Sequence, residues 1–292
     1  MTDAGGHDGG QPLLQGMPQR LYPATPARLA TYEDCPRRYR LTYVDRPPVP
    51  RGRAWAHRSV GAAVHTALAR WWGLPLRART PRAGGALLEQ AWPADGFRDD
   101  DQSRRARVRV RAEVEGYLAG VDPAAEPVAV ERSVAVRTRR AWLWGRVDRL
   151  DDRPGDGAGG TLVVVDYKTG TSVPGPEAAA GSRALAVYAA GAAALMRRPC
   201  RRVELHHLPS GTVAAFDHTE ATLAAHLDRA DAVSADLRRL DAAHARGLSR
   251  GAADEAFPAR VAPRCGWCEV RSRCGPGSVV PPREPWAGVP EE

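Results

Sequence analysis

The sequence predicts a single α/β domain in which a small mixed β-sheet is flanked by helices. Three observations support this fold class. Apolar residues recur with helical spacing in the first part of the chain, their period changes to 2 between residues 127 and 168, and helix and strand patterns alternate after residue 168. A chain of 292 residues, 43% of them hydrophobic, is long enough to bury one sizeable core. We therefore expect one domain over residues 21–275.

The first part of this domain is predicted to be helical. Thr25 is a good N-cap and Pro26 is a favoured first helical residue, so a helix is expected over residues 26–44, where a proline-rich run ends it. Two further helices are expected over residues 59–72 and 104–118. Ahead of them, residues 1–20 have neither a basic leader nor an apolar stretch. We expect a disordered tail there rather than a secretory signal, and a cytoplasmic protein.

A strand meander is predicted next, followed by a return to helices. The expected strands of the meander are residues 128–136, 141–150 and 161–167. The later elements are a helix over 177–196, a hairpin with strands over 203–208 and 212–216, and a helix over 220–245. The Pro-rich residues 276–292 are expected to form a disordered tail.

The charge of the chain indicates a polyanionic partner. The formal net charge is +8 and the pI is about 9.7, and clustered arginines bind phosphate backbones by replacing counterions and forming bidentate bonds. Nucleic acid is therefore the expected partner. No apolar run approaches the length of a membrane span, so membrane insertion is not expected. The chain also lacks a Gly-rich loop ending in Gly-Lys, so any ATP-driven helicase must be a separate subunit.

Lys168 is the only lysine among the 42 Lys and Arg residues. An ammonium is a compact charge with a tunable pKa, whereas a guanidinium is a planar fork that stays protonated, so the two do not substitute for each other chemically. Lys168 follows Asp166 by two positions at the end of an apolar strand, and the two side chains are expected on the same face. This placement indicates a site rather than an accident of coding bias.

A second carboxylate is expected beside this pair. Asp148 lies near the end of the strand over residues 141–150, and its apolar surroundings do not explain it. Two carboxylates on neighbouring strands can hold Mg²⁺, which polarises a phosphodiester and lowers the pKa of bound water. A lysine beside them can orient that water or stabilise the developing oxyanion. Asp148, Asp166 and Lys168 thus predict metal-dependent phosphodiester hydrolysis.

These motifs resemble the PD-(D/E)xK nuclease superfamily, specifically its RecB-like branch. In that branch a Gly-x-Val-Asp strand precedes an Asp-x-Lys strand, as Gly145 to Asp148 and Asp166 to Lys168 do here. The resemblance implies a restriction-endonuclease-like core, metal binding by Asp148 and Asp166, and a catalytic role for Lys168. It also implies a metal-binding histidine in an early helix, which His65 matches. An imidazole ligand would make the site tolerant of Mn²⁺ as well as Mg²⁺.

The helix after the lysine strand matches the family only in part. The family has a Gln-x-x-x-Tyr element there; Tyr188 matches the tyrosine, but Ala184 occupies the glutamine position. Alanine cannot make the hydrogen bonds expected of glutamine. We expect Arg183 to replace it as a phosphate contact, with Arg146 as a second nucleic-acid contact.

Four of the five cysteines form a pattern that predicts a metal centre. Cys35 lies in the first helix, and Cys265, Cys268 and Cys274 lie near the end of the chain, whereas Cys200 is interpreted as a small buried residue. In a cytosolic protein this spacing indicates metal binding more than disulfides, and it does not distinguish zinc from iron–sulfur. RecB-like nucleases of the AddB type and CRISPR adaptation nucleases have the same arrangement of one cysteine before the core and three after it. That resemblance implies a 4Fe–4S cluster that staples the C-terminus.

The resulting hypothesis is a Mg²⁺- or Mn²⁺-dependent deoxyribonuclease. It would cleave single-stranded DNA or DNA ends in repair or recombination, in the manner of a RecB-family exonuclease. Two alternatives stay open at this stage. One is a non-catalytic, metal-stapled DNA-binding module of a helicase or repair complex, which Ala184 would permit, and the other is a CRISPR adaptation nuclease.

Overall fold

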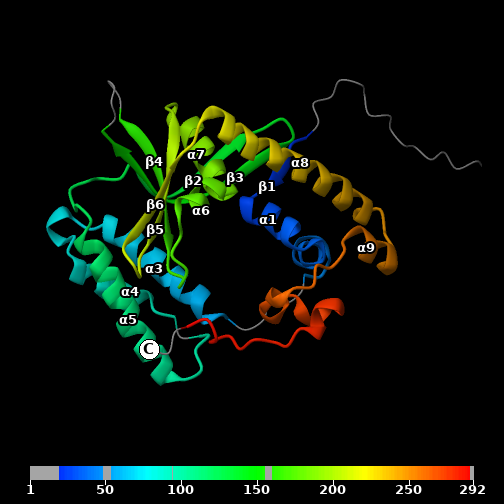
Figure 1. Ribbon diagram of the computed structural model, residues 1–292, viewed down its shortest axis with the longest axis horizontal. Coiled ribbons are helices and arrows are strands. Elements are labelled where there is room, and N and C mark those ends of the chain that lie inside the picture. The colour runs from blue at the N-terminus through cyan, green and yellow to red at the C-terminus, as the bar shows by residue number, and fades with distance from the viewer. Residues whose placement is uncertain (1–19, 49–53, 94, 155–159, 290–292) are drawn as a thin grey trace, which may run out of the picture.

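The computed structural model describes residues 20–48, 54–93, 95–154 and 160–289. It confirms the expected fold class, a mixed sheet flanked by helices (Figure 1). The six strands are β1 (Tyr22–Ala24), β2 (Ala129–Arg137), β3 (Ala141–Arg153), β4 (Thr161–Lys168), β5 (Cys200–His207) and β6 (Thr212–Asp217). They lie in the order β1-β3-β4-β5-β6, with β2 paired to β3 on the other side. The pairs β1–β3 and β4–β5 are parallel, and the others are antiparallel.

Strand β4 is the centre of the core because helices cover both of its faces. Val163, Val165 and Tyr167 pack against α3 (Ala56–Trp72), α4 (Pro81–Ala91) and α5 (Asp100–Ala119). On the other face, Leu162 and Val164 pack against α6 (Pro176–Gly181) and α7 (Arg183–Met196). A strand buried on both faces explains the unbroken apolar run before Asp166. Asp166 is the point at which this run ends.

Two predicted helices are each divided in the structure. The helix expected over residues 26–44 consists of α1 (Pro26–Asp34), α2 (Pro36–Tyr39) and a π-helix, η1 (Arg40–Val44). The break falls at Cys35, which is extended because a following proline disfavours the helical conformation. The helix expected over residues 177–196 is divided at Ser182, whose hydroxyl caps α7 by accepting from the Leu185 N–H at 3.3 Å.

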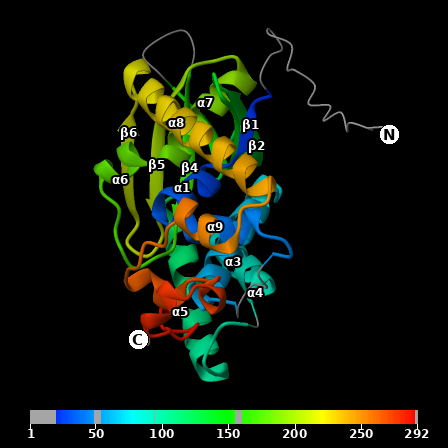
Figure 2. The ribbon, with the colours of Figure 1, turned by 90° about the vertical axis from the view of Figure 1, so that its right-hand side faces the viewer.

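The second half of the chain leaves the sheet and returns to it. Helix α8 (Glu220–Ala245) runs diagonally across the molecule and leads through α9 (Arg250–Ala256) to the C-terminal segments drawn in red (Figure 2). Those segments contain three short 3₁₀ helices, η3 (Pro263–Trp267), η4 (Arg271–Arg273) and η5 (Pro276–Val279). The sequence patterns missed β1, α4, α9 and the short 3₁₀ helix η2 (Leu76–Ala78).

The tail expected over residues 276–292 differs from the prediction of disorder as far as it is described. After η5, the Pro285 carbonyl accepts from the Ala56 N–H at 3.2 Å, and Val289 packs against Ala56 and Ala106. The chain is ordered there because apolar side chains at its end find a buried surface on α3 and α5. Residues 290–292, and residues 1–19 of the expected N-terminal tail, lie outside the described residues.

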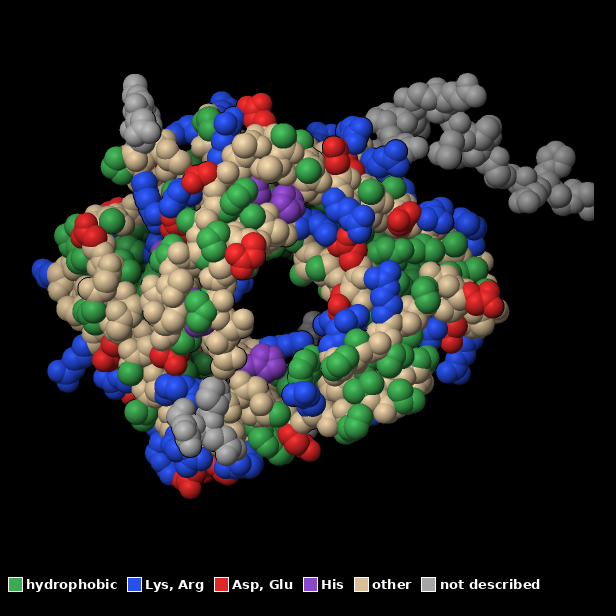
Figure 3. Space-filling view, in the orientation of Figure 1, with side chains coloured by type: hydrophobic (Ala, Val, Ile, Leu, Met, Phe, Trp, Pro, Cys, Tyr) green, Lys and Arg blue, Asp and Glu red, His purple; other side chains and the backbone are tan. Residues whose placement is uncertain are grey.

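This return of the chain encloses an opening. The sheet and α3 border it on one side, and α1, α8 and the C-terminal segments border it on the other (Figure 1). Figure 3 shows that side chains do not fill the opening, and that Lys and Arg side chains, in blue, lie on several parts of its rim. The opening is therefore lined in part by cations.

Replacement of Glu204 by glutamine is expected to destabilise the fold. Glu204 is 1% exposed. Its carboxylate accepts hydrogen bonds from Arg153 at 2.7 Å and from Arg202 at 2.9 Å, and it lies 2.8 Å from His206 Nε2. Burial alone would raise the pKa of Glu204, but these hydrogen bonds outweigh it and hold the pKa well below its usual range. Breaking such a buried pair costs about 3 kcal/mol or more. We expect this decrease in the free energy of unfolding, measured in urea at pH 7.

Acid provides the control for the Glu204 prediction. Because the folded-state pKa is the lower one, the ionised carboxylate stabilises the wild type above the unfolded pKa of about 4.3. That contribution is lost as the pH falls below about 5, so the difference between wild type and Glu204→Gln should narrow there. The exposed Glu220 serves as a matched position, and Glu220→Gln should change the free energy by less than about 0.5 kcal/mol. Equal stability of both variants at pH 7 would contradict the prediction.

Candidate metal centre

The candidate centre forms where strands β3 and β4 part. Their ladder ends at the pair Arg149 and Val165, so the next two residues, Asp148 and Asp166, are opposite each other without a backbone pair. The Asp148 carboxylate takes the place of the missing partner, because its Oδ2 accepts from the Tyr167 N–H at 2.9 Å. The end of the ladder therefore brings together the two aspartates that the sequence singled out.

Lys168 and Asp166 lie on one face of β4, as the alternation of a strand predicts. Lys168 Nζ is 2.6 Å from Asp166 Oδ2, and the lysine side chain is 46% exposed while the aspartate is 20% exposed. Burial raises the pKa of Asp166, Lys168 lowers it, and Asp148 raises it further. The pair thus consists of a sheltered carboxylate and an ammonium that solvent and substrate can reach.

Helix α3 supplies His65 to the same place. His65 Nδ1 is 3.1 Å from Asp148 Oδ1, and its ring meets Tyr167 edge to face at a centroid distance of 5.9 Å. Burial lowers the pKa of His65, but Asp148, Asp166 and a third carboxylate together raise it above the ordinary value. The surroundings of His65 therefore favour positive charge, as expected where a cation is to be held.

The third carboxylate belongs to Glu131 on β2, which the sequence analysis missed. One ligand atom each from His65, Glu131 and Asp148 lie within 4.8 Å of one another, which suits a single hard cation. The β2–β3 register pairs Val130 with Arg149 and Arg132 with Val147, so Glu131 lies between these pairs, level with Asp148. Glu131 has a φ of 49°, in the left-handed region that few non-glycine residues adopt. The predicted hairpin of these two strands was a partial signal for Glu131, but its register, which the structure supplies, was needed to bring Glu131 beside Asp148.

The predicted nucleic-acid contacts are engaged with carboxylates in this structure. Arg146 Nε is 2.7 Å from Glu131 Oε2, and the arginine side chain is 67% exposed. Arg183, at the start of α7, forms an ion pair with Glu33 of α1 and is 20% exposed. Arg146 is therefore the one that can move readily towards a phosphate, and it leaves Glu131 when it does so.

Tyr188 packs directly against the Gly-x-Val-Asp strand. A Cβ on Gly145 would lie 2.3 Å from Tyr188 Cε1 and 3.2 Å from its hydroxyl oxygen, so only glycine allows this contact. Burial raises the pKa of Tyr188, and Asp166 and Asp148 raise it further, so its hydroxyl stays protonated as a hydrogen-bond donor. The glycine of the motif therefore serves to bring the tyrosine of α7 to the carboxylates.

Replacement of Gly145 by alanine should both destabilise the protein and disturb the site. The added methyl overlaps the Tyr188 ring, and overpacking of this kind costs about 1–3 kcal/mol. The control is Gly116→Ala on α5, where a Cβ would have nothing within 4 Å and helix propensity favours alanine by about 1 kcal/mol. Urea unfolding of both variants measures the difference. A Gly145→Ala protein as stable as Gly116→Ala would show that the contact with Tyr188 is not restrictive.

The four patterned cysteines line one cavity, which has a volume of about 120 Å³. Cys35 reaches it from the break between α1 and α2, and Cys265, Cys268 and Cys274 reach it from η3 and the segments around η4. All four are free thiols, and five arginines line the same cavity, namely Arg38, Arg58, Arg260, Arg264 and Arg271. Cys200 lies elsewhere and is 1% exposed, as a small core residue would be.

A family model described as the PD-(D/E)XK nuclease superfamily matches residues 23–275. The chain belongs to this superfamily. Its members hydrolyse phosphodiester bonds with divalent metals, so membership implies a metal-dependent nuclease that binds nucleic acid. A search of curated proteins finds no match. Among the helices that the structure describes, none is long and apolar enough to span a membrane.

The donors beside the point where the β3–β4 ladder ends fit the metal that this superfamily uses. They are carboxylate oxygens and one imidazole nitrogen, the donors that Mg²⁺ and Mn²⁺ accept. The predicted ligands His65 and Asp148 are brought together with Glu131, whereas Asp166 lies beside them and contacts Lys168. The geometry therefore adds one carboxylate to the predicted set.

Proposed function

We propose that this protein is a Mg²⁺- or Mn²⁺-dependent deoxyribonuclease that cleaves single-stranded DNA or the single-stranded ends of duplexes. The observation that carries the proposal is the assembly of His65, Glu131 and Asp148 next to the Asp166–Lys168 pair, in a chain of this superfamily. His65, Asp148 and Asp166 are the proposed metal ligands, and Glu131 is added as a further one. A metal held there polarises the phosphodiester and makes a bound water acidic.

The remaining groups act around the reacting phosphate. Lys168, whose ammonium is partly exposed, orients the attacking water and offsets the charge that develops on the phosphate oxygens. Tyr188 donates a hydrogen bond near the carboxylates, and Arg146 and Arg183 contact neighbouring phosphates. Because Arg146 is held by Glu131 before substrate binds, strand binding and the release of Glu131 for the metal occur together in this proposal.

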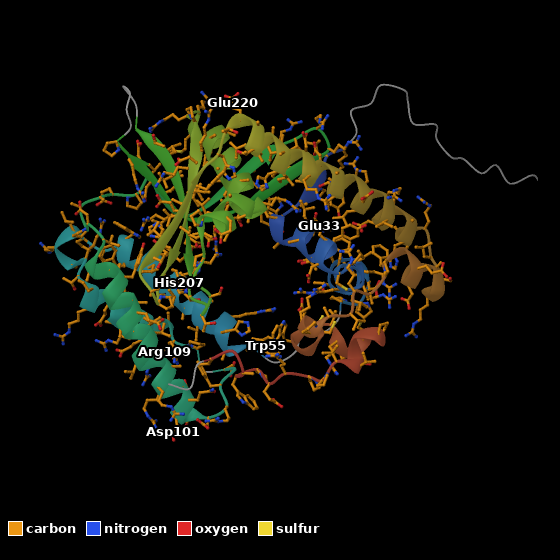
Figure 4. The ribbon with its side chains drawn as sticks, in the orientation of Figure 1. Glu33, Trp55, Asp101, Arg109, His207 and Glu220 are labelled. Carbon is orange, nitrogen blue, oxygen red and sulfur yellow. The ribbon has the colours of Figure 1, made fainter. Side chains whose placement is uncertain are left out.

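The opening supports a single strand as the substrate. His207, which is paired in register with Lys168, lies on the sheet side of the opening, and Glu33 of α1 lies across from it (Figure 4). A strand that passes between them runs beside the end of β4. This path suits unpaired DNA, because a flexible single strand can pass through an opening whose rim carries Lys and Arg side chains (Figure 3).

We further propose that the four cysteines bind a 4Fe–4S cluster. The four cysteines line one cavity, which supports a shared metal centre, and the choice of a 4Fe–4S cluster over zinc rests on the resemblance of the one-plus-three cysteine arrangement to that of RecB-like nucleases. The five arginines in the wall offset the negative charge of a thiolate cluster. Its role is structural, since it joins α1 and α2 to the end of the chain.

The deciding experiment is cleavage of end-labelled single-stranded DNA with Mg²⁺, with Mn²⁺ and with EDTA. We expect cleavage with either metal and none with EDTA. Iron and zinc analysis with visible absorbance of anaerobically purified protein tests the cluster separately. DNA binding without cleavage under every metal would instead favour a non-catalytic module in a helicase or repair complex, the alternative to which Ala184 at the glutamine position lends support.

A further inference from the structure

A second cluster of charged side chains lies next to the cysteine cavity, and none of its residues belongs to the metal centre. It is a pocket of about 370 Å³ at the junction of η1, the end of α8, the start of α9 and η4. Leu41, which lines it, also packs against Val270 and Cys274 of the cysteine segments. The pocket therefore shares a wall with the cysteine cavity and joins three parts of the chain that are distant in sequence.

The pocket is strongly cationic. Four arginines, Arg40, Arg46, Arg250 and Arg273, line it together with His244, and the one carboxylate in its wall is Asp45. When Asp254, which pairs with Arg40 at 2.9 Å, is counted with Asp45, the four arginines exceed the carboxylates by two charges. Like charges gathered in one concave site repel one another, so the arrangement is favourable when an anion occupies it.

The donors of this pocket are only partly used. Arg40 is 6% exposed, and its Nε and Nη1 are held in ion pairs with Asp45 at 3.4 Å and Asp254 at 2.9 Å. Among the described residues, the exposed guanidinium groups of Arg250 and Arg273 have neither a hydrogen bond nor an ion pair. Planar guanidinium forks bind tetrahedral phosphate through paired hydrogen bonds. The unused donors match that ligand.

We propose that this pocket binds a phosphate group, with Arg250 and Arg273 as its mobile donors and Arg40 as its buried base. The phosphate comes either from the backbone of a bound DNA strand, a source that rests on the proposed function, or from a free phosphate-bearing small molecule, which does not. Bound there, the anion links α8 and α9 to the cysteine segments and so stabilises the side of the opening that these elements form.

The test uses the full chain carrying Lys168→Ala, so that binding is measured without cleavage. The variant Arg250→Gln with Arg273→Gln is compared with Arg201→Gln and Arg239→Gln, two exposed arginines elsewhere that lose the same charge. Calorimetry with pyrophosphate and anisotropy with a labelled single-stranded oligonucleotide give the two affinities. We expect the pocket variant to lose pyrophosphate affinity by about tenfold or more, and the control to keep it.

The oligonucleotide identifies the source of the phosphate. If the backbone enters the pocket, the pocket variant also binds the strand more weakly, and its slope of log affinity against log salt falls by about 0.7. Loss of pyrophosphate binding alone identifies a free phosphate ligand. If the parent binds neither probe better than the pocket variant, or if the control loses as much, the proposal is wrong. Failure of cleavage in the wild type would overturn the nuclease instead, without affecting these affinities.

Discussion

Replacing Lys168 with alanine is expected to lower the rate of single-stranded DNA cleavage by about 10²- to 10³-fold. The ammonium is the only lysine in the chain and lies 2.6 Å from Asp166, so no neighbouring lysine can take its place. Because its side chain is half exposed and holds no part of the core, the free energy of unfolding and the affinity for DNA should change little. Single-turnover cleavage, urea unfolding and oligonucleotide binding measure the three quantities.

Lys168→Arg separates charge from chemistry. A guanidinium keeps the positive charge, but it is a planar group that stays protonated, so it cannot hold the water as a compact ammonium does. We therefore expect cleavage nearly as slow as in Lys168→Ala. Recovery of most of the activity by arginine would mean that Lys168 supplies only charge, and full activity of the alanine variant would refute the mechanism.

Replacing Asp148 with asparagine is expected to weaken metal binding by about 100-fold or more and to abolish cleavage. Asp148 is the group that contacts His65 at 3.1 Å, shares the cluster with Glu131 and is opposite Asp166. Removing a residue that only orients a metal ligand lowers metal affinity by about 10- to 100-fold, and removing a direct ligand should lower it further. Calorimetric titration with Mn²⁺ measures the affinity independently of activity.

Glu131→Gln is the informative companion to Asp148→Asn. If Glu131 is a ligand, its amide variant loses metal affinity by a similar order, although the motif of the family does not include it. If Glu131 only holds Arg146, the Mn²⁺ affinity stays at the wild-type value and DNA binding changes instead. Wild-type Mn²⁺ affinity in Asp148→Asn itself would show that the metal binds elsewhere.

Much of the fold could be predicted because the signals are local. The period of 2 in β2, β3 and β4 and the helical stripe of α3 arise from burial patterns within single elements. The division of the first helix at Cys35 was not predicted, although Pro36, which disfavours a helical residue before it, is a local signal for it. Element β1 was missed because three residues are too few to show a period, and their pairing with β3 depends on a partner far along the chain.

The site was predicted in its chemistry but not in its full membership. Asp148, Asp166 and Lys168 are each anomalous in an apolar strand, so they could be singled out one at a time. Glu131 occurs among other charged residues and becomes notable only when the register of β2 and β3 places it beside Asp148. The C-terminal residues were predicted to be disordered because their Pro-rich composition is typical of disorder. Val289 packs against Ala56 of α3, a contact that composition cannot predict.

By itself, the sequence determined the α/β class and the paired Asp-x-Lys and Gly-x-Val-Asp strands, since each depends on the spacing of near neighbours. It also singled out the four patterned cysteines, by residue type and by a family resemblance. Only the tertiary structure decided that the β3–β4 ladder opens at Asp148 and Asp166, that Glu131 joins His65 there, and that the C-terminal segments close a ring. The physical reason is that these features depend on register and on long-range packing. Such contacts join residues that are far apart in the sequence, as Val289 and Ala56 are, and no local pattern encodes them.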